Sequence, residues 1–293
     1  MSKWAGDKFV GEFKDGYYNG LGTRTDADGR ITEGTRKDDE FQYAPTVPPT
    51  VTAPQPPFAK PETDFTNKRI ALVVGNANYN VGPLNNPVRD AHLIGTALKQ
   101  YGFKVILVEN VNYRNFRKAL ARFSEELRIA GPKTTAFFYY SGHGMSYQGN
   151  NYLVPLGSRI NSLVDIDLEL VRAERVHAAM GSITSGVKIM LLDACRNSPF
   201  KSFIRSRELG LVPMNAPRGT IVGYSTSPGR LALDGEGTNS PYALGLVRAI
   251  KMPDLTIEAV LKQTLNWVDA TTNGKQIPWY ESSLRGHFYF NKN

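Results

Sequence analysis

Cys195 is the only cysteine of the 293-residue chain, and its surroundings could make it a nucleophile. The apolar run 187–192 leads to it, with Asp193 and Ala194 between them. Such a run is typical of a buried parallel strand, and open α/β sheets place their chemistry in the loops at the carboxyl ends of these strands. A lone cysteine is more often a small buried hydrophobe, so a catalytic role depends on a partner base.

His143 is the candidate for that base. It stands between Gly142 and Gly144, three residues after a run of β-branched and aromatic residues at 134–140. A neighbouring imidazole can hold a thiol as its reactive thiolate, and glycines let backbone N–H groups approach a substrate oxyanion. The pair therefore predicts nucleophilic acyl transfer, with Cys195 as nucleophile and His143 as acid and base.

Ser-Gly-His-Gly at 141–144 and Asp-Ala-Cys-Arg at 193–196 resemble the two signatures of the caspase and metacaspase cysteine peptidases. Their separation also resembles the caspase arrangement, in which the histidine lies about 50 residues before the cysteine. The resemblance spans residues 68–290 and implies a caspase-like α/β fold. It also implies that His143 and Cys195 are the catalytic residues, and that the N–H groups of Gly144 and Cys195 form the oxyanion hole. The sequence offers no evident third member of a triad.

The residues around the nucleophile predict a basic residue at the cleaved position. Caspases, which cut after aspartate, carry glutamine where this chain has Asp193, whereas metacaspases and paracaspases, which cut after basic residues, carry an acid there. In metacaspases a second acid joins this one in the pocket that binds the basic side chain. Segment 84–91 resembles the metacaspase segment that carries the second acid, and this resemblance implies that Asp90 belongs to the pocket. It also implies that Ser141 forms part of the pocket wall. Asp90 is equally well explained as the N-cap of a helix, and the two roles are compatible. A looser alignment places Asp234 where caspases carry an arginine for acidic substrates.

Alternating strand and helix patterns from Lys68 onward predict the scaffold that positions these residues. Strands are expected at 69–75, 104–108, 134–140, 152–155, 187–192, 219–224 and 287–290, and helices at 90–101, 113–129, 174–180, 241–250 and 256–270. This alternation predicts a doubly wound, mostly parallel sheet with helices on both faces.

Two segments precede this peptidase domain of residues 68–293. Residues 1–41 contain short aromatic and β-branched stretches separated by glycine, which predict β-hairpins and resemble a MORN repeat, with one full and one degenerate copy. Residues 42–67 are rich in proline and predict an extended linker. Because such repeats bury little surface alone, residues 1–41 are expected to dock on the main domain, self-associate or bind a protein partner, unless they are only a tail.

Composition weighs against several other functions. The formal net charge of +8 is scattered without long Lys/Arg tracts, so we expect a basic surface and no nucleic-acid partner. No apolar stretch reaches the roughly 18 residues of a membrane span, and the start lacks a signal peptide's hydrophobic core, so a cytoplasmic location is expected. Asp165, Asp167 and Glu169 lack the glycine and the ligand spacing of a calcium-binding loop. We therefore expect no metal site, no cofactor and no essential calcium.

The stretch 197–218, which follows Cys195, is long for a connection within a compact domain. It carries Lys201, Arg205 and Arg207, and caspase relatives are often cut in this loop, so an enzyme with a basic preference could process itself there. A lid that is never cleaved is an equal alternative. The rival for the whole chain is a catalytically silent caspase-like scaffold that binds partners through its N-terminal segment.

Overall fold

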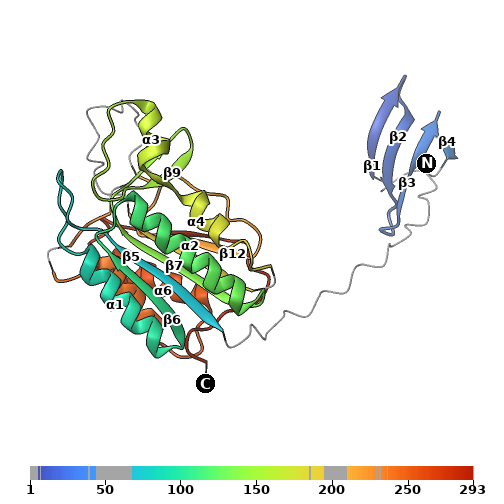
Figure 1. Cartoon of the computed structure of the whole chain (residues 1–293). Coiled ribbons are helices and arrows are strands. Elements are labelled where there is room, and N and C mark those ends of the chain that lie inside the picture. The colour runs from blue at the N-terminus through green and yellow to red at the C-terminus, as the bar shows by residue number, and fades with distance from the viewer. Residues whose placement is uncertain are drawn as a thin grey trace. The chain divides into compact units, whose positions relative to one another are not determined.

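The computed structural model describes Gly6 and residues 8–38, 40–43, 68–184, 186–194, 210–228, 230, 232–235 and 237–292. The chain divides into two compact units, residues 1–59 and residues 60–293, which are described separately (Figure 1).

The N-terminal unit is a four-stranded antiparallel sheet in the order β1-β2-β3-β4. Its strands are β1 (Lys8–Lys14), β2 (Tyr17–Thr25), β3 (Ile31–Lys37) and β4 (Glu40–Tyr43). Asp15 and Gly16 join β1 to β2 with φ angles of 52° and 87°, as expected for an Asp-Gly hairpin turn. The ring of Phe9 packs 4.2 Å from that of Tyr18 across the two strands. The predicted hairpins are thus confirmed.

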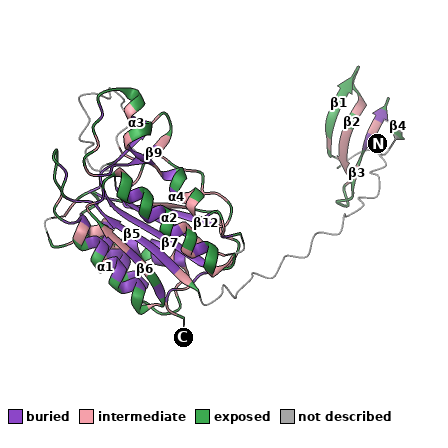
Figure 2. Ribbon diagram, viewed as in Figure 1, coloured by how far each residue is buried: buried purple, intermediate pink, exposed green. Residues whose placement is uncertain are grey.

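The second unit is built on a six-stranded sheet in the order β13-β12-β11-β7-β5-β6. Five strands are parallel, namely β5 (Arg69–Gly75), β6 (Phe103–Glu109), β7 (Thr135–Gly142), β11 (Lys188–Ala194) and β12 (Thr220–Tyr224), and β13 (Trp279–Ser282) is antiparallel at one edge. Every residue of β7 is buried, which explains its continuous apolar and aromatic sequence (Figure 2). The predicted mostly parallel sheet is confirmed.

Helices cover both faces of this sheet (Figure 1). On one face, α1 (Pro87–Gln100), α5 (Pro241–Ile250) and α6 (Ile257–Thr271) pack in one hydrophobic core. On the other face, α2 (Tyr113–Ala130) and α4 (Ala173–Ala179) form a second core. The apolar stripe of α2 is buried as its spacing predicts, with Phe116, Phe123 and Leu127 fully inaccessible.

A small three-stranded sheet and a short helix were predicted only in part, since the strand expected at 152–155 overlaps one strand of this sheet, Asn150–Leu153. They are β8 (Gly144–Tyr147), β9 (Asn150–Leu153), β10 (Val171–Arg172) and α3 (Leu163–Glu169), and the sheet order is β10-β9-β8. Elements of two to seven residues are too short to show a clear hydrophobic period. They form a separate core around Tyr79, Met145 and Ile166 beside the end of β7.

Two sequence predictions are wrong. Helix α1 begins at Pro87 with Asn86 as its N-cap, so Asp90 lies inside the first turn and does not cap the helix. Proline suits the first helical position because its missing N–H needs no partner there. Residues 287–290 form no strand but one isolated bridge at Tyr289, and their aromatic pattern arises because Phe288 and Phe290 are buried in the core.

No helix in the described ranges combines the length and the apolar character needed to cross a membrane.

Candidate functional site

The two predicted signatures leave the sheet side by side. Strands β7 and β11 are parallel neighbours, with Ser141 opposite Asp193 and Gly142 opposite Ala194. A Cβ added to Gly144 would lie 3.0 Å from the Cβ of Ala194, so this glycine lets β8 start directly against the end of β11. Cys195 itself lies outside the described residues, as does the rest of 195–209. The register thus places His143 at the same edge of the sheet as the end of β11, which Cys195 follows in the sequence.

The backbone of His143 is held by tyrosine hydroxyls, and its side chain is buried. Its N–H donates to Tyr79 Oη at 3.0 Å, and its carbonyl accepts from Tyr140 Oη at 2.8 Å and from the N–H of Val154 at 3.0 Å. The imidazole also packs on the Tyr79 ring, with 4.4 Å between the centroids. These contacts fix both the position and the plane of the ring.

A backbone carbonyl orients the His143 ring. Nε2 lies 2.6 Å from the carbonyl oxygen of Gly82. Because a carbonyl oxygen only accepts hydrogen bonds, Nε2 must carry a proton, which leaves Nδ1 of the neutral ring as the atom that can take up a proton. Gly82 thus plays the orienting part for which the sequence showed no candidate, since a backbone group has no side-chain signature.

Asp90, Ser141 and Asp193 meet in the interior of the site, and all three are fully buried. Asp90 Oδ2 accepts from Ser141 Oγ at 3.2 Å, and Asp90 Oδ1 accepts from the N–H of Ser240 at 2.9 Å. Asp193 Oδ2 accepts from Ser240 Oγ at 2.5 Å and from Tyr139 Oη at 3.1 Å. Ser240 therefore bridges the two carboxylates, and we call Asp90, Ser141, Asp193 and Ser240 the acidic cluster.

The start of α5 contributes to the electrostatics of the acidic cluster. Ser240 is the N-cap of α5, and its Oγ accepts from the N–H of Ala243 at 3.0 Å while its proton goes to Asp193. The positive end of the helix dipole therefore faces the carboxylates. Within the described residues, however, Oδ1 of Asp193 has no hydrogen-bond partner, and no cation forms an ion pair with this side chain. A buried carboxylate oxygen in this state favours binding of a cation.

Two tyrosines beside Asp193 stay neutral. Burial, and then the charges of Asp193 and Asp90, raise the pKa of Tyr139 well above its usual value. Burial, and then Asp193, also raise the pKa of Tyr242. Tyr139 therefore remains a hydrogen-bond donor to Asp193 across the physiological pH range.

Asp234 is only half-buried and lies beside the segment that precedes α1. Its Oδ2 accepts from the N–H of Asn85 at 2.7 Å, and its carbonyl accepts from Asn86 Nδ2 at 2.5 Å. These bonds tie the loop after β12 to the start of α1 and do not join Asp234 to Asp193 or Asp90. A role of Asp234 in substrate binding stays a prediction.

Besides Gly82, sequence reasoning missed three residues that contact the buried carboxylates, namely Tyr139, Asn239 and Ser240. Asn239 Nδ2 donates to Asp90 Oδ1 at 2.9 Å. The pair Ser240-Pro241 signals a helix start, but only the packing of α5 against β11 shows that the capping serine also reaches Asp193. No local sequence signal could have indicated this second role.

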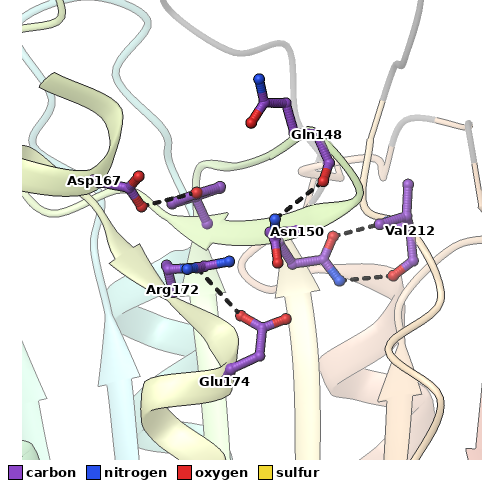
Figure 3. A network of polar contacts seen from close by, with 8 residues as sticks. Gln148, Asn150, Asp167, Arg172, Glu174 and Val212 are labelled. Carbon is purple, nitrogen blue, oxygen red and sulfur yellow. Dashed lines mark hydrogen bonds and ion pairs between the residues drawn. The ribbon is translucent and has the colours of Figure 1, made fainter. Parts of the chain in front are cut away.

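Two of the three carboxylates that we considered for calcium, Asp165 and Asp167, have protein partners. Asp165 Oδ2 accepts from the N–H groups of Asn161 and Ser162, and these bonds lower the pKa of its carboxyl group. Asp167 Oδ1 accepts from the Tyr152 hydroxyl at 2.9 Å (Figure 3). No cluster of three metal-ligating side chains occurs among the residues that the structure describes.

The chain that returns after Cys195 is anchored on two strands. The side-chain amide of Asn151 on β9 binds both the N–H and the carbonyl of Val212, at 2.8 and 2.6 Å (Figure 3). On the other side, Glu281 of β13 accepts from the N–H groups of Met214 and Ala216. Segment 211–216 is thus fixed, whereas the predicted processing positions Lys201, Arg205 and Arg207 lie outside the described residues.

Comparison with known proteins agrees with this architecture. Over 129 residues, 44% of this chain, the sequence is 27% identical to mucosa-associated lymphoid tissue lymphoma translocation protein 1 of Homo sapiens and 26% identical to its homologue from Mus musculus. The matched region makes up only 15% of the length of either relative. Residues 68–289 match the family model of the caspase domain, which covers most of the chain. The chain therefore belongs to the caspase domain family of cysteine peptidases.

Proposed function

We propose that this protein is a cysteine endopeptidase that cleaves protein or peptide substrates after basic residues, through a dyad of Cys195 and His143. The acidic cluster is the observation that carries the specificity. It holds two fully buried carboxylates, and Asp193 has an oxygen that lacks a partner within the described residues. A guanidinium or ammonium group from the substrate would supply the missing donor and the compensating charge.

In the proposed reaction, the Cys195 thiolate attacks the carbonyl carbon of the scissile peptide bond. The N–H groups of Gly144 and Cys195 bind the developing oxyanion, and His143 gives its Nδ1 proton to the leaving amine as the C–N bond breaks. Water, deprotonated by His143, then cleaves the thioester and restores the thiol. The Gly82 carbonyl keeps Nε2 protonated throughout, so that Nδ1 carries the exchanged proton.

Arginine should be preferred over lysine. A planar guanidinium presents five N–H donors and can bind two carboxylates at once, whereas an ammonium group is a compact point charge. Asp90 and Asp193 both bond to Ser240, so they are close enough for one guanidinium to reach both. An aspartate side chain at the cleaved position would meet two like charges and should be excluded.

A panel of fluorogenic peptides with Arg, Lys or Asp at the cleaved position tests this proposal. We expect kcat/KM to be about 10-fold higher for Arg than for Lys, because roughly one charge-assisted bond distinguishes them. The Asp peptide should not exceed the background of Cys195→Ala, and a chelator should change neither result.

Equal rates for the Arg and Asp peptides would contradict the basic specificity. A chain that cut none of the peptides would instead be the silent scaffold, with its N-terminal sheet as the interaction element. That sheet exposes 64% of Val10, 58% of Phe13 and 63% of Leu21, which is consistent with binding a partner or a second copy.

The same pocket would allow self-processing after Lys201, Arg205 or Arg207. The next described segment is fixed by Asn151 and Glu281, so a cut would separate the chain between Cys195 and this anchor without releasing either end from the domain. Incubated wild-type protein should yield fragments that end at one of these residues, as measured by intact mass, and Cys195→Ala should not. An uncut and fully active wild type would show that the loop is only a lid.

A further inference from the structure

A cleft with a volume of about 280 Å³ lies beside His143 and belongs to none of the sites described above. Its walls come from residues 79–81 and from residues 154, 155 and 157–159. Tyr79 is common to the cleft and to the catalytic site, because its ring lines the cleft and also packs 4.4 Å from the imidazole of His143. The cleft is therefore one residue, Tyr79, away from His143.

The cleft and the acidic cluster lie on opposite faces of β7, the strand that leads to His143. Successive residues of β7 face opposite surfaces of the sheet. Tyr139 and Ser141 point to the α1 and α5 face, where they contact Asp193 and Asp90. Tyr140 points to the other face, where its hydroxyl bonds to the carbonyl of Val154 in the cleft wall. Because His143 follows the end of this strand, a substrate that fills both sites would pass the imidazole.

We propose that this cleft binds the part of the substrate that follows the scissile bond, and this inference rests on the proposed peptidase function. His143 must face the leaving amine in order to protonate it, so the chain beyond that amine continues on the far side of the imidazole. A cavity smaller than those that hold drug-sized ligands suits one or two residues of a peptide.

The cleft's composition indicates which residues it prefers. Tyr79, Val154 and Pro155 give it a buried, largely apolar wall, and Val81 adds an apolar side chain that is 63% exposed. An apolar residue directly after the cut would cover this surface. Arg159 is exposed at the rim, and within the described part of the chain it takes part in no ion pair. An acidic residue one position further on would meet it.

Two internally quenched peptides test the cleft. Both carry Arg before the cut and Leu after it, and the next residue is Glu in one and Lys in the other. The wild type should cleave the Glu peptide with a kcat/KM roughly 5-fold higher, and Arg159→Glu should reverse this preference, since an exposed charge pair contributes modestly. Arg285→Glu makes the same charge change at another exposed residue and should keep the wild-type preference. Replacing Leu by Gly should lower kcat/KM at least about 10-fold.

The outcomes test the assignment of the cleft and the proposed peptidase function separately. Cleavage of both peptides with a ratio that Arg159→Glu leaves unchanged would overturn the cleft assignment and leave the peptidase function standing. If neither peptide were cut, the peptidase function would fail. Their binding to the full chain by fluorescence polarisation would then decide on the cleft: a Glu over Lys preference that Arg159→Glu reverses supports it, and equal or absent binding overturns it.

Discussion

Replacing His143 by alanine should lower kcat/KM for an Arg peptide by about 10³-fold or more, because one side chain is lost from two steps. In the proposed mechanism the imidazolium holds the Cys195 thiol as a thiolate, and the same ring protonates the leaving amine. The thiol alone should then titrate near its ordinary pKa of about 8.5. Alkylation of Cys195 by iodoacetamide should thus be slow at neutral pH in the variant and recover as the pH rises through that value, whereas the wild type should react fast at neutral pH.

His177→Ala is the matched control for this experiment. His177 is half-buried, bonds to Thr220 Oγ1 at 3.2 Å on the far part of the sheet, and has a pKa lowered by burial and then by Lys188. It is therefore neutral at the assay pH and distant from the reaction, and its loss should leave both turnover and alkylation unchanged. A His143→Ala protein alkylated as fast as the wild type at neutral pH would remove His143 from the mechanism.

The parts of the fold that were predicted best are those in which the local hydrophobic pattern of the sequence agrees with the burial of the residues. Strands β7 and β11 are buried along nearly their whole length, so their apolar runs and the residues at their ends were both readable. The same holds for α2, whose apolar stripe at helical spacing faces one core. The strand predicted at 287–290 is wrong because local pattern and burial disagree there. Phe288 and Phe290 are buried by tertiary packing against Phe103, and within the described residues this segment forms only an isolated bridge.

Half of the candidate site depends on contacts that no local pattern contains. Asp90, Ser141 and Asp193 could be assigned together only through the family resemblance. The register of β7 and β11 places Ser141 beside Asp193, and the packing of α1 brings Asp90 to Ser141. Ser240 is 47 residues from Asp193 in sequence, and Gly82 acts through its backbone. Such groups become visible only when the fold brings them to the catalytic edge.

Replacing Asp193 by asparagine should lower kcat/KM for Arg peptides by about 10²-fold while leaving the fold intact. Asparagine has the same shape, and its carbonyl oxygen can still accept from Tyr139 and Ser240. It loses the charge, however, and presents an amide N–H₂ where the guanidinium would bind. Removing one charged partner of a buried, hydrogen-bonded pair costs about 2–5 kcal/mol, of which the lower end corresponds to the expected change in rate.

Citrulline at the cleaved position makes this test specific, because it keeps the shape of arginine without its charge. The wild type should prefer Arg over citrulline by about 10²-fold, and Asp193→Asn should lose most of this preference, which a double-mutant cycle of the two changes would measure. Asp254→Asn supplies the control, since it makes the same substitution at an exposed residue whose φ of 57° asparagine tolerates. Asp193→Asn would contradict the acidic pocket if it cleaved Arg peptides at the wild-type rate. It would equally do so if it slowed Arg and citrulline peptides by the same factor, because Asp193 would then act on the catalytic groups and not on the substrate's charge.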